Sequence, residues 1–392
     1  VEILDQKQNP DYLKNLERFD LVFRSPGVPY NLPELVRARR RGIKFSSGTK
    51  LFFERCPATI IGITGTKGKG TVSTLLAEML RAAGREVFLV GNIGLPAITV
   101  LSRVRPESLV VFELSSFQLQ DLTVSPSHAV ILDLFPDHQD SHRDLREYYR
   151  AKSNLVRFQK PSDSVFVFND SPRARAMAKL SRGKKFLVTA EQERLLRPTD
   201  LLVTGPHHFR NAVMAAAVAR KLNVSEASIK RVAKQFRGLE HRLELVKKIG
   251  PVSVYNDSAA TNPGAAAAAV RSFPSANLIL ITGGQSKGLD YAPLVRAVKN
   301  SAVKLVILFG ANRRELTRAF KPVTTRVVSV TTLNEALAVA WSFVKNLSTR
   351  EAGETANGSA VVLFAPGAAS FDQFTDYAAR GREFKRLVDQ IT

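Results

Sequence analysis

The chain has 392 residues, and its 57 Lys and Arg against 35 Asp and Glu give a formal net charge of +22. Hydrophobic residues make up 44% of the sequence, which is enough for large buried cores and predicts two or three domains rather than one. The single cysteine, Cys56, excludes a disulfide-stabilised secreted fold. We find no apolar run of about 18 residues and no signal-peptide pattern, so we expect a cytoplasmic protein with no membrane partner.

The excess of basic residues extends over the whole chain at similar density. Basic clusters at 37–41 and 182–185 attract polyanions without reading any sequence. An even distribution is more typical of a generally basic surface, or of a protein that binds small anionic molecules, than of a nucleic-acid-binding tail or patch. Nucleic acid is therefore the less favoured partner.

Residues 1–55 contain three short apolar runs, at 1–4, 21–24 and 43–45, that we interpret as strands. These elements are too few for an independent α/β domain, so we expect this section to be part of one.

The section 56–238 opens with a predicted strand at 59–63, a glycine-rich turn and a helix that starts near Thr71. Two further predicted strands, at 109–114 and 129–134, each end in polar residues. Apolar β-branched runs that alternate with helical patterns predict a parallel sheet covered by helices.

The section 239–392 shows the same alternation and predicts a doubly wound sheet of Rossmann type, in which ligands bind beyond the carboxyl ends of the strands. The predicted strands are 252–256, 278–282, 304–309, 326–330 and 360–365, and the predicted helices include 291–300, 334–345 and 371–387. Polar blocks at 256–258, 282–287 and 366–370 fall at such strand ends.

One glycine-rich segment, Gly62-Ile-Thr-Gly-Thr-Lys-Gly-Lys-Gly-Thr71, lies between a predicted strand and a predicted helix. Backbone N–H groups in such a turn, together with a helix N-terminus, form an anion site, which favours phosphate binding. The general P-loop pattern is not met, because Ile63 and Gly70 stand where it needs a glycine and a Ser or Thr. The strand–loop–helix context still favours phosphate binding over a merely tight turn.

This loop resembles the phosphate loop T-G-T-x-G-K-[ST]-T of the Mur ligases of peptidoglycan synthesis. Further blocks in the order of that family, and of its D-glutamate-adding branch, cover essentially the whole chain: 112–119, 137–138, 149–152, 205–211, 241–244, 256–262, 283–288 and 369–374. The resemblance implies a three-domain α/β architecture. Residues 1–55 would be a truncated Rossmann-like domain that binds the UDP-sugar, 56–238 a central P-loop ATPase-type parallel sheet that binds ATP, and 239–392 a Rossmann-like domain that binds the amino acid and ATP.

The activity implied by the resemblance is ATP-dependent amide ligation by a cytoplasmic monomer. ATP would phosphorylate the carboxylate of UDP-N-acetylmuramoyl-L-alanine, and the amine of D-glutamate would attack the acyl phosphate. Both partners in the first step are anions, so the site needs cations, including two Mg²⁺ ions.

The resemblance also assigns residues. Its catalytic set is Lys69, Glu113, His138, Lys152 and Arg242. Its ATP-binding set is Gly65, Thr66, Lys67, Gly68, Lys69, Gly70, Thr71, Asn211, Arg242 and Asp257. Its substrate-binding set is Asp5, Ser25, Asn92, Ser115, Lys287, Ser370 and Tyr377. Its metal ligands are Glu113, His138, Thr71 and Lys152, the last as a carbamate, which burial near cations would permit by lowering the lysine pKa.

The sequence departs from the family pattern at several positions. Gly70 replaces a hydroxyl that helps to hold Mg²⁺, Lys67 and His208 replace asparagines, and the chain begins near the family's second strand, so we expect an incomplete nucleotide-sugar domain. Ala259 stands where the D-glutamate enzyme has a lysine that contacts the amino acid. Loss of one charged contact costs roughly 1.5–3 kcal/mol.

Two alternatives therefore stay open: a related Mur-type ligase with another acceptor such as L-glutamate, and a catalytically impaired relative that binds nucleic acid. Folylpolyglutamate synthesis is less favoured, because the block 370–374 and 380–381 resembles the muropeptide branch. Phe371 and Tyr377 are alternatively core aromatics. We interpret Cys56 and His128 as structural residues.

Overall fold

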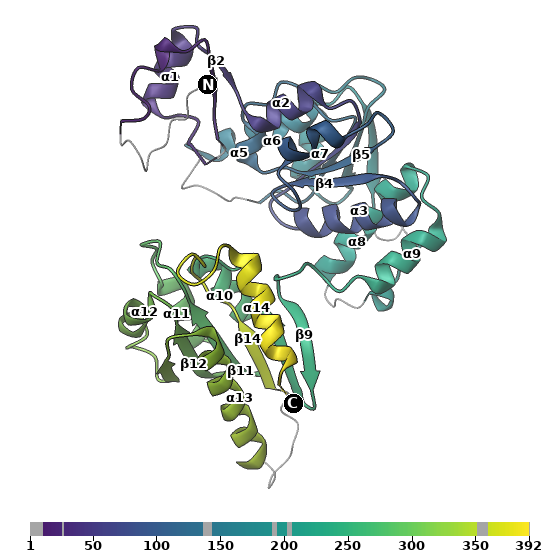
Figure 1. Cartoon of the computed structure of the whole chain (residues 1–392). Helices are drawn as coiled ribbons and strands as arrows, with labels where there is room; N and C mark the ends of the chain where they lie inside the picture. The colour runs from purple at the N-terminus through teal and green to yellow at the C-terminus, as the bar shows by residue number, and fades with distance from the viewer. Residues whose placement is uncertain are drawn as a thin grey trace. The chain divides into compact units, whose positions relative to one another are not determined.

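The computed structural model describes residues 11–25, 27–135, 143–189, 194–201, 206–350 and 360–391. The chain divides into two compact units, an N-terminal unit, Val1–Phe236, and a C-terminal unit, Arg237–Thr392 (Figure 1). Each unit is described by itself.

The N-terminal unit begins with a small α/β element. Strand β1 (Leu21–Phe23) pairs in parallel with β2 (Lys44–Ser46), and helix α1 (Pro33–Arg40) connects them. A short 3-10 turn, η1 (Leu16–Arg18), contributes Leu16 to the small core of this element. The two strands predicted at 21–24 and 43–45 are confirmed, and the strand predicted at 1–4 lies outside the described residues.

The larger part of this unit is a six-stranded sheet with the order β4-β5-β3-β6-β7-β8, in which every pairing is parallel. Its central strands are mostly apolar, as expected for a parallel sheet that helices cover on both faces. The parallel α/β fold predicted for this section is confirmed. The strands are β3 (Thr59–Thr64), β4 (Val87–Gly91), β5 (Leu109–Glu113), β6 (His128–Ile131), β7 (Ser164–Phe168) and β8 (Lys184–Val188).

Helices α3 and α8 pack against each other on one face of this sheet (Figure 1). The other face is covered by residues of α2, α4, α6 and α7, with Phe52, Phe112 and Leu155 in the core. The helices are α2 (Gly48–Arg55), α3 (Lys69–Ala82), α4 (Ala97–Val100), α5 (Ser116–Leu119), α6 (Leu145–Arg157), α7 (Pro172–Ala178), α8 (Pro206–Lys221) and α9 (Glu226–Gln235), with 3-10 turns η2 (Leu101–Arg103) and η3 (Pro198–Asp200).

The C-terminal unit has a second six-stranded sheet, with the order β13-β12-β11-β14-β10-β9. Its pairings are parallel except at the edge, where β9 runs antiparallel to β10. The five predicted strands of this section are confirmed. The strands are β9 (Glu244–Ile249), β10 (Val252–Asn256), β11 (Asn277–Gly283), β12 (Val303–Phe309), β13 (Arg326–Ser329) and β14 (Ala360–Phe364).

Helices lie on both faces of this second sheet and form two separate cores. One core joins the sheet to α13 and α14, and the other joins it to α10, α11 and α12 (Figure 1). Within the described part of the chain, no helix is both long and apolar enough to cross a membrane. The helices are α10 (Pro263–Arg271), α11 (Ala292–Lys299), α12 (Arg313–Ala319), α13 (Leu333–Arg350) and α14 (Tyr377–Asp389).

Two predicted helix starts and one missed strand differ from the structure. The last helix begins at Tyr377 instead of 371, because the Asp376 side chain accepts the Ala379 N–H at 2.6 Å and caps the helix there. Helix α3 begins at Lys69, two residues before the predicted start, directly after Gly68 in the left-handed conformation. Strand β9 was not predicted, because an edge strand that is partly exposed on both faces lacks a continuous apolar run.

Candidate functional site

The glycine-rich loop of the N-terminal unit connects β3 to α3, as predicted for a phosphate loop. A Cβ added at Gly65 would lie 2.6 Å from Leu132 Cβ, and one at Gly68, where φ is 83°, would clash with Asn211 Oδ1. Both positions therefore require glycine. The second contact also shows that Asn211, from α8, packs directly against the loop, where the sequence predicts an ATP contact.

Two lysine side chains converge on this loop from different helices. Lys69 Nζ donates to Gly65 O and to Thr66 O, each at 3.1 Å. Lys152 Nζ, from α6, donates to the same Gly65 O at 3.0 Å and to Thr64 Oγ1 at 3.2 Å. The structure therefore brings together the two lysines that the sequence analysis selected.

Lys152 is buried at 2% exposure, with its Nζ 4.9 Å from the centre of the Tyr148 ring. Its hydrogen bonds to a carbonyl and a hydroxyl oxygen are those of an amino group. The same ring's hydroxyl lies 3.0 Å from Thr66 Oγ1, which also accepts the Phe135 N–H at 2.9 Å. The loop is thus held in shape by side chains from α6.

A carboxylate lies at the same edge of the sheet. Glu113 ends β5, is 4% exposed and pairs in register with Ile63 of β3, one residue before Thr64. Thr71, in the first turn of α3, adds a hydroxyl that is largely buried. A carboxylate and a hydroxyl oxygen are the donor types that Mg²⁺ prefers, so these residues fit the predicted ion. The other predicted ligand, His138, lies outside the described residues.

The remaining predicted residues of this unit are less enclosed. Ser25, Lys67 and Asn92 are exposed, and Asp5 lies outside the described residues. Ser115 is the N-cap of α5, where its Oγ accepts the Gln118 N–H at 3.3 Å and Gln118 Oε1 accepts the Ser115 N–H at 2.9 Å. Its hydroxyl therefore has a structural role in this capping box.

Two arginines beside predicted site residues were missed by the sequence analysis. Arg24, next to Ser25, is 4% exposed and forms an ion pair with Asp121 at 2.7 Å. Arg210, next to Asn211, pairs with Asp133 at 3.0 Å and with Asp170 at 2.7 Å. Each ion pair joins residues far apart in the sequence, and no local pattern predicts such a partner.

In the C-terminal unit, Asp257 directly follows β10 and is 8% exposed. Its Oδ1 accepts the Leu243 N–H at 3.1 Å. Burial raises the pKa of Asp257 to about 7, although the charge of Arg242 acts in the opposite direction. Arg242 itself is exposed.

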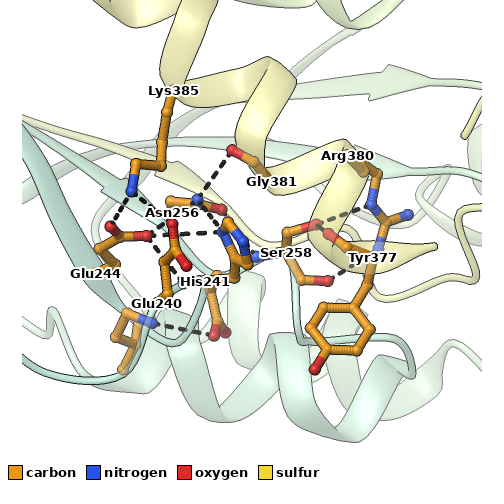
Figure 2. Close-up of polar contacts among 11 residues, drawn as sticks. Glu240, His241, Glu244, Asn256, Ser258, Tyr377, Arg380, Gly381 and Lys385 are labelled. Carbon is orange, nitrogen blue, oxygen red and sulfur yellow. Dashed lines mark hydrogen bonds and ion pairs between the residues drawn. The ribbon is translucent and has the colours of Figure 1, made fainter. Parts of the chain in front are cut away.

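A fully buried arginine joins two loops of this unit. Figure 2 shows Arg380, from α14, pointing at the loop after β10, where its Nε donates to Ser258 Oγ and its Nη2 to Ser258 O, each at 3.0 Å. Its Nη1 donates to Ala368 O and Ala369 O, each at 3.1 Å. Burial lowers the pKa of Arg380 to about 10, so the side chain is still charged at neutral pH. Arg380 therefore holds the loops that carry Asp257 and Ser370.

A second polar network surrounds His241, which is 3% exposed and has a φ of 64°. Its Nδ1 lies 3.0 Å from Asn256 Nδ2, which also donates to Glu244 Oε2 at 3.3 Å (Figure 2). Lys385 Nζ reaches the other Glu244 oxygen at 2.6 Å and Glu240 at 3.0 Å. Burial lowers the pKa of His241, so a neutral imidazole is expected at pH 7. This network fixes the turn that carries Arg242.

The predicted glutamate-binding residues have different exposures. Lys287 is exposed, Ser370 is buried, and Tyr377 is 40% exposed with its ring nearly perpendicular to the His241 ring. The alternative interpretation of Phe371 and Tyr377 as core aromatics is wrong, since Phe371 is 68% exposed.

The two residues interpreted as structural have partners that fit this role. His128 Nδ1 lies 2.6 Å from Ser164 Oγ, and burial lowers its pKa. Burial raises the pKa of the Cys56 thiol, which disfavours the thiolate that a nucleophile needs.

Comparisons with known proteins agree with the geometry. The model of the Mur ligase middle domain matches residues 63–201, and that of the Mur ligase glutamate ligase domain matches residues 241–349. Proteins named UDP-N-acetylmuramoylalanine--D-glutamate ligase are similar over 97% of this chain. The one from Acetivibrio thermocellus is 34% identical with 84% of its length covered, and the one from Symbiobacterium thermophilum is 36% identical with 86% covered.

Solved structures support the fold. The UDP-N-acetylmuramate-alanine ligase MurC of Thermotoga maritima matches with a TM-score of 0.57 at 19% identity, covering 94% of this chain and 85% of that one. A folylpolyglutamate synthase of Mycobacterium tuberculosis, complexed with ADP and AMPPCP, matches with a TM-score of 0.61 at 14% identity, covering 86% of this chain and 92% of that one.

Proposed function

Because this chain belongs to the Mur ligase family, and within it to the UDP-N-acetylmuramoylalanine--D-glutamate ligases, we propose that it adds D-glutamate to UDP-N-acetylmuramoyl-L-alanine with ATP in peptidoglycan precursor synthesis. The observation that carries this proposal is the approach of Lys69 and Lys152 to one carbonyl oxygen, Gly65 O, within the loop between β3 and α3. We further propose that it acts in the cytoplasm as a monomer, through the three sections 1–55, 56–238 and 239–392.

The residues of the N-terminal unit support phosphoryl transfer from ATP. Lys69 supplies a fixed cation beside the loop, and the free N–H groups at the start of α3 add partial positive charge. Both stabilise the charge that spreads over the transferred phosphoryl group. Glu113 and Thr71, with His138, would hold Mg²⁺, which neutralises phosphate charge when bound.

We propose that Lys152 takes up carbon dioxide as a carbamate and serves as an oxygen ligand at a second ion. Support comes from its burial and from the shared acceptor with Lys69, since desolvation and a neighbouring cation both favour the neutral amine that this reaction requires. Native mass measurement of the folded protein, kept near neutral pH in bicarbonate because a lysine carbamate loses carbon dioxide on acidification or unfolding, should show an added 44 Da, about the mass of one carbon dioxide. Lys152→Arg should abolish the added mass, and an unmodified original chain at high bicarbonate would contradict this role.

The remaining residues are proposed as ligand contacts. Arg242 and Asp257, with Asn211, would bind ATP. Lys287, Ser370 and Tyr377 would bind D-glutamate. Asp5, Ser25, Asn92 and Ser115 would bind the nucleotide sugar.

An ADP-release assay tests the proposed reaction. With UDP-N-acetylmuramoyl-L-alanine and ATP present, D-glutamate should stimulate ADP release more than L-glutamate, D-aspartate or L-alanine. Lys69→Met should lower the rate by about a hundredfold or more, the loss typical when a preorganised charge is removed. Lys179→Met, which changes an exposed lysine of the same unit with no proposed role, is the matched control and should change the rate far less. Absence of stimulation by D-glutamate would overturn the proposal.

The acceptor preference has its own test, because Ala259 stands where the related enzymes have a lysine. Ala259 lies directly after the Arg380-held Ser258, and its N–H donates to His241 O at 3.0 Å, so its backbone is fixed. Ala259→Lys should lower the KM for D-glutamate by about tenfold, the lower range for one charged hydrogen bond. An unchanged KM would show that this position is not a lost contact, and a preference for L-glutamate in the original chain would identify the alternative acceptor.

A further inference from the structure

A groove of about 940 Å³ lies in the N-terminal unit, away from the residues proposed for catalysis. Its walls come from the turn into β2, including Lys44, from the segment after α5, and from α6. The phosphate loop and the proposed nucleotide-sugar contacts Ser25, Asn92 and Ser115 are not among its lining residues. The groove flanks the amino end of β2, whereas Ser25 follows the carboxyl end of the parallel strand β1.

One face of helix α6 packs against the phosphate loop, and another face lines the groove. Lys152 is buried against the phosphate loop, whereas Arg146, Arg150 and Arg157 are exposed and line the groove. At 100° per residue the three arginines lie within a narrow sector, well away from Lys152. They extend over eleven residues, a rise of about 16 Å.

The acidic residues of the groove already have partners. Asp121 forms the buried ion pair with Arg24 at 2.7 Å. Asp144 caps α6 by accepting the Glu147 N–H at 2.8 Å, and Glu147 Oε2 accepts the Arg143 N–H at 2.8 Å. Each of these carboxylates is therefore directed at another group, and none of them forms an ion pair with Arg146, Arg150 or Arg157.

Five cations of the groove have no carboxylate as an ion-pair partner among the described residues. They are Arg39, Lys44, Arg146, Arg150 and Arg157. Arg146 and Arg150 stand one helical turn apart, where like charges repel. An anion in the groove would relieve this repulsion, and its charges would need to extend along the helix.

The groove also presents an aromatic ring. Phe158 directly follows α6, is 41% exposed and lines the same wall as Arg157. An exposed ring beside guanidinium groups can stack on a nucleobase. The carboxylate side chains of an acidic peptide have no ring that could stack in this way. Cations in a row with an aromatic ring are the combination that binds single strands without sequence preference.

We propose that this groove binds single-stranded nucleic acid through its phosphates, independently of the ligase reaction. The basic residues are spread evenly along the sequence, yet the fold gathers Lys44 of β2 and the three arginines of α6 around one groove. The phosphate backbone supplies the anionic chain, and Phe158 stacks on one base.

The test is fluorescence anisotropy of the full chain with a labelled single-stranded DNA of about 20 nucleotides and mixed sequence, at several salt concentrations. The triple variant Arg146→Gln/Arg150→Gln/Arg157→Gln should raise Kd by at least about tenfold and reduce the salt slope by about two, since each phosphate contact in a single strand contributes about 0.7. Its ADP release should be unchanged.

The matched control removes three other exposed cations that have no carboxylate partner within the described part of the chain: Arg314→Gln/Arg318→Gln/Lys321→Gln. This variant should change Kd less than about twofold. Equal weakening by both triple variants would overturn the proposal, because general charge attraction would then explain the binding. Absence of binding by the original chain at low salt would also overturn it.

Two further measurements separate nucleic acid from other polyanions. Phe158→Ala keeps the charge and should still raise Kd by about fivefold or more through loss of stacking, and it serves where the triple variant fails to fold. Unlabelled oligonucleotide should displace the probe, whereas polyglutamate of equal charge should not. An unchanged Kd for Phe158→Ala, or equal displacement by polyglutamate, would overturn the assignment to nucleic acid.

Discussion

The two sheets place their polar loops at the same kind of edge, but cations hold these loops in different ways. In the central sheet, the cations that hold the loop are Lys69 and Lys152, which are also the proposed functional groups. In the C-terminal sheet, the cation that holds the loops is Arg380, whereas the proposed ligand contacts Arg242 and Lys287 are exposed. Structure and chemistry therefore share residues in the first region and use separate residues in the second.

This difference follows from the cost of burying charge. A buried cation must find oxygen acceptors, and backbone carbonyls of a nearby loop supply them. Once Arg380 has joined the loops around Ser258 and Ala369, neighbouring side chains are free to remain in solvent until a ligand binds. In the central sheet, the functional lysines supply this restraint themselves, so a change in either one affects the loop as well as the reaction.

Substitution of Arg380 should have the largest effect and tests whether this residue holds the loops of the C-terminal sheet. Arg380→Met should lower the free energy of unfolding by about 3–5 kcal/mol, because it removes the donor to Ser258 O and Ala368 O and leaves Ala369 O with the Gln285 N–H alone. Urea unfolding monitored by circular dichroism measures the loss. Arg386→Met is the control, since Arg386 is 55% exposed and, among the residues that the structure describes, pairs only with Glu383, so the expected loss is under about 1 kcal/mol. Similar losses for both variants would mean that Arg380 does not hold the loops.

Substitution of the buried Asp257 should have the next largest effect on the free energy of unfolding, and this effect should depend on pH. The pKa of Asp257 rises from 3.8 to about 7 through burial, so the folded protein keeps a proton that the unfolded chain releases. The stability that this proton gives is fully present below about pH 4 and is lost as pH rises to about 7. Asp257→Asn cannot ionise and still accepts the Leu243 N–H, so it should exceed the original chain in unfolding free energy by about 2–4 kcal/mol at pH 8 and match it at pH 4.

Chemical denaturation at pH 4, 6 and 8 measures this divergence. The exposed Asp389→Asn is the control, and its difference from the original chain should be the same at each pH. Parallel stability curves for Asp257→Asn and the original chain would show that Asp257 is already ionised in the folded protein at neutral pH.

Much of the architecture could be predicted from the sequence, because its signals are local. Apolar runs between helical patterns located β3, β5 and β6 of the central sheet and every strand of the C-terminal sheet except β9. Glycines 65 and 68 marked a loop whose backbone leaves no room for a Cβ. Lys69 and Lys152 were selected only through the resemblance to a family. Spacing alone would not relate residues 83 positions apart, since only the tertiary fold brings α6 to the loop.

The residues that were missed depend on partners from distant parts of the chain. In the sequence, Arg380 resembles a surface arginine of an amphipathic helix. It is buried because it donates to carbonyl oxygens that are distant along the chain, Ala368 O at 12 residues and Ser258 O at 122 residues. Arg24 likewise depends on Asp121. The start of α14 had a local signal in Asp376, which could have corrected the boundary, because aspartate is a preferred N-cap.

Substitution of Ser115 should have the smallest effect. It tests whether side chains of the central region combine a structural role with ligand binding. The Ser115 hydroxyl caps α5 and is also proposed to contact the nucleotide sugar. Ser115→Ala should lower the free energy of unfolding by about 1 kcal/mol, as expected for a lost cap, and should raise the KM for the nucleotide sugar. Ser342→Ala, an exposed serine in α13, is the control and should change neither quantity.

A second substitution at this position separates the two roles. Ser115→Asn keeps a capping oxygen and should restore the stability, because asparagine is as good an N-cap as serine. If the hydroxyl also binds substrate, the KM of this variant stays raised although the helix is capped. Recovery of both stability and KM would instead mean that Ser115 acts only through α5, and the central region would then separate its structural and functional side chains at this position, as the C-terminal region does.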